Sequence, residues 1–128
     1  MDKVVHFEIP SDNRERAKKF YSSVFSWDIM EMPFQGDVYT SVITSPIDEN
    51  HMHQEKGAIN GAIINRDKSI SAPVITISVE SIEDSAKKIE TAGGKLVVPK
   101  GEVPDMGYYA YFKDTEGNIL GLWENLKK

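Results

Sequence analysis

The sequence contains no cysteine, which excludes disulfide bonds, zinc–thiolate sites and thiol nucleophiles. Basic clusters are also scarce: the net charge is −5, and Glu15 interrupts the longest basic run, residues 14–19. A nucleic-acid partner is therefore excluded, because binding one requires a basic face. No apolar stretch approaches a length of about 20 residues, which a membrane span needs, and the first residues lack the apolar core of a signal peptide. We expect a cytoplasmic protein with no membrane partner.

The composition that remains is that of an ordinary globular protein. Hydrophobic residues make up 40% and charged residues 27% of the 128 residues, a length that suits one domain. We therefore expect a single domain over residues 1–128. The acidic balance weakly favours cationic ligands. The phosphate-binding glycine motifs and the Gly-x-Ser-x-Gly elbow are absent, which argues against nucleotide-binding and serine-hydrolase folds.

Hydrophobic periodicity shows one order of elements, strand–helix–strand–strand–strand, twice. In the first half, an alternating strand precedes a helix with Asp12 as its expected N-cap and an apolar stripe that includes Phe20. The expected elements are a strand at 3–9, a helix at 11–25, strands at 27–32 and 37–44, a polar loop at 45–57 and a strand at 60–65. In the second half they are strands at 73–79, 95–99, 108–114 and 118–124, with a helix at 81–94.

The second half carries clear boundary signals of its own. Ser81 is the expected cap of its helix, and Gly117 supplies the positive φ of a hairpin turn. The repeat predicts an α+β fold of two βαβββ modules, about 1–66 and 67–128. Two such modules pair into a half-open curved sheet with a concave cleft.

Three segments carry a family resemblance: VVHFEIPSDNRERAKKFYSSVFSW, ISVESIEDSAKKIETAGGKLVVP and YFKDTEGNILGLWE. With them the chain resembles the vicinal oxygen chelate superfamily, which includes glyoxalase I, bleomycin-resistance proteins and extradiol dioxygenases. The resemblance implies the glyoxalase-like fold, a small-molecule ligand and a homodimer, which sedimentation would test. It also implies, in many members, a divalent metal in the cleft.

The four metal-ligand positions of the superfamily are carried over one by one. His6 falls on the first, and aligning Ser11 with Val79 places Val74 on its partner. The last strand of module one offers Gly61 or Ala62, and that of module two offers Gly121. Only His6 retains a ligating side chain, whereas a protein-held metal needs about three. We therefore expect a degenerate site that holds no metal and no other cofactor.

The remaining candidates are placed by strand alternation. Val5 and Phe7 would pack under the helix, so that His6 and Glu8 face the cleft. Gly121 would leave room for a ligand beside Trp123. We expect the ligand-binding residues to be His6, Tyr39, Ala62, Val74, Thr76, Tyr109, Tyr111, Gly121 and Trp123.

These residues favour a glyoxalase/bleomycin-resistance-like protein that binds a small organic molecule. One alternative is a metal-independent enzyme of lyase or isomerase type, in which His6 and Glu8 transfer protons. Another is a metal-dependent lyase or dioxygenase, which Val74 and Gly121 disfavour. Glyoxalase I activity is not expected. The polar loop that carries Glu49, His51 and His53 is interpreted as solvated, or as a lid.

Overall fold

The computed structural model describes residues 1–50 and 52–127. The chain divides into two compact units, which are described one at a time. Module one is His6–Pro73. Module two combines Met1–Val5 with the chain from Val74 onward, so the division falls within the first strand. In the described residues, no helix has the length and apolar character of a membrane span.

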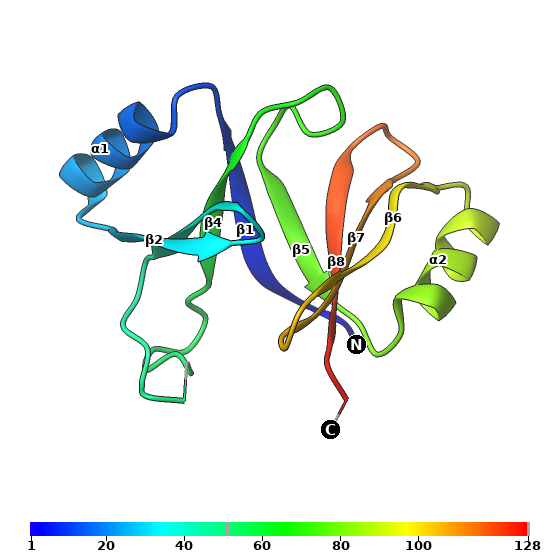
Figure 1. The fold of residues 1–128 in the computed structure, drawn as a ribbon. Helices are drawn as coiled ribbons and strands as arrows, with labels where there is room; N and C mark the ends of the chain where they lie inside the picture. Colours follow the sequence, from blue (N-terminus) through cyan, green and yellow to red (C-terminus); the bar gives the residue numbers. More distant parts are fainter. Residues whose placement is uncertain (51, 128) are drawn as a thin grey trace. The chain divides into compact units, whose positions relative to one another are not determined.

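Module one has the predicted order of elements. Its strands lie in the order β2-β3-β4-β1; β1 and β4 are parallel, and the other neighbours are antiparallel (Figure 1). A parallel pair needs a long crossover connection, which α1, β2 and β3 provide here. The elements are β1 (Lys3–Ser11), α1 (Arg14–Phe25), β2 (Asp28–Phe34), β3 (Asp37–Ile43) and β4 (Asn60–Asn65).

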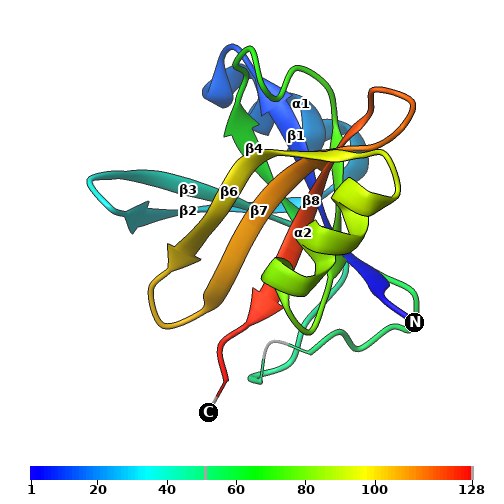
Figure 2. The ribbon, with the colours of Figure 1, turned by 90° about the vertical axis from the view of Figure 1, so that its right-hand side faces the viewer.

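Module two repeats this arrangement. Its order is β5-β8-β7-β6, with β5 and β8 parallel, and α2 lies in front of β7 and β8 in Figure 2. The predicted hairpin between β7 and β8 is present, and Gly117 has the positive φ of +85° that its turn requires. The elements are β5 (Val74–Ser78), α2 (Ile82–Thr91), β6 (Lys95–Val103), β7 (Gly107–Lys113) and β8 (Ile119–Asn125). Both modules thus confirm the α+β, βαβββ prediction.

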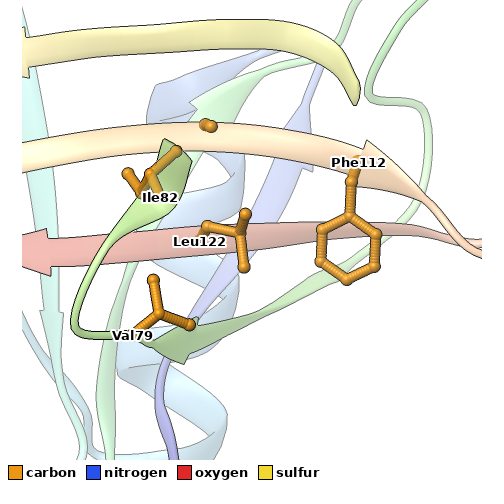
Figure 3. Close-up of a cluster of buried hydrophobic side chains, with 5 residues drawn as sticks. Val79, Ile82, Phe112 and Leu122 are labelled. Atoms are coloured by element: carbon orange, nitrogen blue, oxygen red, sulfur yellow. The ribbon is translucent and has the colours of Figure 1, made fainter. Parts of the chain in front are cut away.

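The core of module two lies between α2 and its sheet. Val79 and Ile82 meet Phe112 and Leu122 there, together with Ala110 (Figure 3). Ser81 caps α2 as expected, because its side chain accepts a hydrogen bond from the Asp84 amide at 3.2 Å. The cap fixes the point at which the chain turns from β5 into the helix.

The start of α1 differs from the sequence-based expectation. Asn13, not Asp12, is the N-cap: its side chain accepts from the Arg16 amide at 3.0 Å, while Asp12 forms an ion pair with Arg66. The apolar stripe also packs less than expected, since no residue of α1 is buried and Phe20 is 54% exposed. Tyr21 and Phe25 of α1 instead pack against Trp27, which stacks on Tyr21 at a centroid distance of 5.2 Å.

Glu124 joins the end of β8 to the start of α2. It is only 7% exposed, and its Oε1 accepts a hydrogen bond of 2.7 Å from the Ile82 amide, one of the first N–H groups of the helix. Its Oε2 lies 3.5 Å from the Lys100 ammonium group, which also contacts the more exposed Glu83. A buried carboxylate is thereby paired on both oxygens.

Glu124→Ala should lower the free energy of unfolding by about 1–3 kcal/mol, because the Ile82 amide then loses its buried acceptor. Urea unfolding measures this loss. Glu83→Ala is the matched control, since it also removes a contact of Lys100 but from an exposed position; it should cost less than about 0.5 kcal/mol. Equal losses for the two variants would contradict a special role for Glu124.

Candidate functional site

In module one, the helix-covered side of the sheet can be identified from Phe7. Its ring lies 5.9 Å from that of Trp27, next to α1, and it covers the backbone of Gly61. Neighbouring residues of a strand point to opposite faces. His6 and Glu8 of β1 therefore lie on the face away from α1, which we call the open face of module one.

The other two candidates of module one lie on this same open face. Ala62 is the register partner of both Glu8 and Ser41, and Tyr39 precedes Ser41 at a spacing of two residues on β3. The structure thus brings together His6, Glu8, Tyr39 and Ala62. It adds Ser41, which the sequence analysis did not name although the alternation of β3 indicates it.

Burial shifts the pKa values of two groups on this open face. Burial, followed by the negative charge of Glu8, raises the pKa of Tyr39 to about 12, so its phenol stays protonated and remains a hydrogen-bond donor. Burial lowers the pKa of His6, because it disfavours the imidazolium form. Near pH 7 the face therefore presents a neutral imidazole, a phenol and a carboxylate.

The candidates of module two share one face of its sheet, away from α2. Thr76, Gly121 and Tyr111 are consecutive register partners across β5, β8 and β7. Tyr109 and Trp123 form the next pair of the same face, and Val74 precedes Thr76 by two residues. We call this surface the open face of module two because the helix of the module does not cover it, although Val74 and Thr76 are buried.

Two of the aromatic side chains of this face, Tyr109 and Trp123, lie on glycines. A Cβ atom added at Gly101 would meet the Tyr109 ring at 2.6 Å, and one added at Gly107 would meet the Trp123 ring at 2.6 Å. Each ring thus lies over bare backbone, and the Trp123 Nε1 donates a 2.8 Å hydrogen bond to Asn125 Oδ1. Tyr109 and Tyr111 pack edge to face at 6.3 Å. Sequence reasoning missed the two glycines. Gly101 lies opposite the aromatic Tyr109 on the paired strand, which is a usable signal, whereas Gly107 lies opposite Asn125.

Gly121 has a different neighbour from the one expected. A Cβ atom there would lie 2.7 Å from the Oγ1 of Thr76, which is buried. The sequence analysis expected the missing side chain to leave open space for a ligand. That expectation is wrong next to the backbone, because Thr76 Oγ1 occupies the space that a Cβ atom would need. Gly121 instead permits the close approach of Thr76.

The strand register of module one decides whether Gly61 or Ala62 corresponds to Gly121. The two helix caps, Asn13 and Ser81, are related by the same shift as His6 and Val74. This shift relates Glu8 to Thr76, and their respective parallel partners are Ala62 and Gly121. Ala62, not Gly61, therefore corresponds to Gly121.

The donor atoms at the four superfamily metal positions do not form a ligand set. His6 supplies an imidazole, while Ala62, Val74 and Gly121 supply no oxygen, nitrogen or sulfur from a side chain. Across residues 1–50 and 52–127, no three side chains of His, Asp or Glu gather closely enough to hold a metal ion. The residues present do not fit the metal that the superfamily often carries.

The loop before β4 contains a local contact of its own. Ile47 and His53 form an isolated antiparallel bridge, and His53 and Glu49 are exposed. His51 lies outside the described residues. The interpretation of this loop as solvated or as a lid stays a prediction.

Comparison with solved structures shows the fold. Over 98% of each chain, the structure is similar to that of a variant of Streptomyces coelicolor methylmalonyl-CoA epimerase in complex with 2-nitronate-propionyl-CoA, with a TM-score of 0.67 and 11% sequence identity. At this identity the likeness concerns the fold alone. The chain therefore has the glyoxalase-like α+β fold.

The sequence then identifies the family. Residues 3–122 match the model of the Glyoxalase/Bleomycin resistance protein/Dioxygenase superfamily, to which this chain belongs. The chain is 27% identical over 118 residues to a glyoxylase-like domain-containing protein of Didymella fabae, covering 90% of this chain and 88% of that protein. It is 25% identical over 122 residues to CFP32 of Mycobacterium tuberculosis, whose name assigns it provisionally to the glyoxylases. That match covers 91% of this chain, which spans less than half, 43%, of CFP32.

Gly121→Ala should lower the free energy of unfolding by about 1–3 kcal/mol, because the added methyl group overlaps Thr76 Oγ1. In a Thr76→Ala background the same substitution should cost at least about 1 kcal/mol less, which a double-mutant cycle of urea unfolding measures. Ser78→Ala is the matched background, since Ser78 lies on the same strand and face but opposite Trp123. If the cost of Gly121→Ala were the same in both backgrounds as in the wild type, contact with Thr76 would not be the reason for a glycine at position 121.

The depressed pKa of His6 should make stability pH-dependent. In the unfolded chain the imidazole of His6 binds a proton near pH 6.5, which is a higher pH than in the folded chain. The free energy of unfolding therefore falls as the pH drops from about 7.5 to about 5.5. His6→Gln should flatten this fall, as measured by urea unfolding at both pH values. His53→Gln, an exposed control, should leave it as in the wild type. An unchanged slope in His6→Gln would contradict the burial of the imidazole.

Proposed function

We propose that the protein binds a small organic molecule without a metal ion, on the open face of module two. The observation that carries the proposal is the fixed aromatic surface of module two. The rings of Tyr109 and Trp123 lie over Gly101 and Gly107, and Tyr109 remains 36% exposed. Rings immobilised on glycine lose little conformational entropy when a ligand stacks on them.

The donor set supports a metal-independent role. One imidazole, that of His6, is too few for a protein-held transition metal, which needs about three protein ligands. Burial also leaves His6 neutral near pH 7, because it lowers the pKa of the imidazole. It is then available for hydrogen bonding with a ligand or for proton transfer.

The chemistry of the two faces suggests the kind of ligand. The aromatic side chains of module two favour a flat apolar or aromatic body, which stacks on their rings. Taken by itself, the open face of module one, with Glu8 and the protonated phenol of Tyr39, favours a separate polar or cationic ligand. The net charge of −5 acts in the same direction.

A metal-independent enzyme is the second candidate, and the pKa of His6 favours it. A neutral imidazole on the same face as a carboxylate is able to accept a proton from a ligand. The glyoxylase names of two relatives agree with an enzyme. The reaction would then be of lyase or isomerase type, with His6 and Glu8 as the catalytic pair.

A fluorescence assay with Trp27→Phe tests the proposal. The chain has two tryptophans, so this variant leaves Trp123 as the reporter of the open face of module two. Flat aromatic compounds, with and without an amino group, are titrated while Trp123 emission is recorded. Tyr109→Ala should weaken the tightest binder by about tenfold or more, equivalent to about 1.4 kcal/mol.

The control is Ile75→Ala, an exposed apolar residue on the other face of the same sheet, which should leave the affinity unchanged. Equal affinities of Tyr109→Ala and wild type would show that the ligand binds elsewhere.

Elemental analysis of protein purified without chelators is run in parallel. About one transition metal per chain, lost in His6→Ala, would overturn the metal-free proposal. If the protein converts the bound compound into a product and His6→Gln abolishes this conversion, the enzyme hypothesis is favoured.

A further inference from the structure

A crevice of about 360 Å³ lies on module one, on the side of the sheet that carries α1. It is lined by the end of β1 and the first turns of α1. Ile9 and Pro10 of β1 form one wall, and Phe20 and Tyr21 of α1 form the other. Because Ile9 alternates with Glu8, this crevice is separate from the open face that carries His6.

The apolar walls of the crevice are incompletely covered by the protein itself. Phe20 is 54% exposed, although it is a large aromatic residue on a helix that faces a sheet. Ile9 is half-buried beneath the same opening. An apolar group entering the crevice would bury surface on both walls, at a gain of about 25 cal/mol per Å² removed from water.

The charged residues of the crevice carry a net positive charge. Arg16 and Arg66 line it with one carboxylate, that of Asp12. Asp12 pairs with Arg66 at 3.1 Å, and Arg66 also donates to the Ser71 carbonyl. The guanidinium group of Arg16, in contrast, has no hydrogen-bond or ion-pair partner within residues 1–50 and 52–127. This cation lies four residues before Phe20, on the same side of α1.

We propose that this crevice binds a small anion that carries an aromatic or other apolar group, such as an aryl phosphate or an aryl carboxylate. The guanidinium group of Arg16 holds the anionic head by charge-assisted hydrogen bonds, with Arg66 as a second positive charge. The apolar body inserts between Ile9 and Phe20. The head group does not depend on the free N–H groups of α1, since Asn13 already accepts from the Arg16 amide.

Phenyl phosphate is the probe, titrated at low ionic strength into uniformly ¹⁵N-labelled protein and followed by amide chemical shifts. The shifts should change around residues 9–20. Arg16→Gln should weaken binding by about tenfold, or about 1.4 kcal/mol. Lys19→Gln is the matched control: it removes a positive charge from the same helix, outside this crevice, and should change affinity by less than about twofold.

A second variant separates the two parts of the ligand. Phe20→Ala should weaken phenyl phosphate but leave the weaker binding of inorganic phosphate unchanged, since only the ring contacts Phe20. Benzoate replaces phenyl phosphate in a further titration, and dependence on Arg16 with either head group supports the proposal. Equal affinities of Arg16→Gln and Lys19→Gln, or shifts confined to other parts of the chain, would overturn it. Both substitutions change exposed side chains, and circular dichroism checks that each variant is folded.

Discussion

Parallel pairing of the first and last strands of each module is the constraint on which the rest of the structure depends. It places Glu8 beside Ala62 in module one and Thr76 beside Gly121 in module two. Because such a pair needs a crossover that carries a helix, the helix of each module covers one face of its sheet and leaves the other face free of helix. The register of this pair then decides which side chains share the open face. The position of every candidate functional residue depends on this register.

Glycine makes the close approaches in these sheets possible, and in each case the neighbour is a named side chain. Phe7 covers Gly61 on the helix side of module one, while Tyr109 covers Gly101 on the open face of module two. Thr76 takes the space beside Gly121. A glycine in a strand therefore indicates a close neighbour, but the chain itself supplied that neighbour at all three positions.

The sequence predicted those features that depend on local pattern. The repeated βαβββ order, the Ser81 cap and the turn at Gly117 follow from periodicity and from residues with strong backbone preferences. Gly101, which lies beneath the Tyr109 ring, was missed for a non-local reason. The predicted strand ended at residue 99, whereas β6 runs to Val103, with two register shifts that bring Gly101 opposite Tyr109. Bulges of this kind have no single-strand signature, so cross-strand neighbours beyond them are hidden.

The two modules share a backbone plan but carry different chemistry on their open faces. Module one presents ionisable side chains: His6, Glu8 and Tyr39. Module two presents rings and a hydroxyl group, with Thr76 at the position that corresponds to Glu8. Strand pairing determines the face to which each side chain points but not the type of side chain. Corresponding positions of the two modules can therefore carry different residues. The absence of ligating side chains at three of four superfamily positions leaves the backbone plan intact. The chemical difference between the two modules is therefore carried by the side chains on those faces.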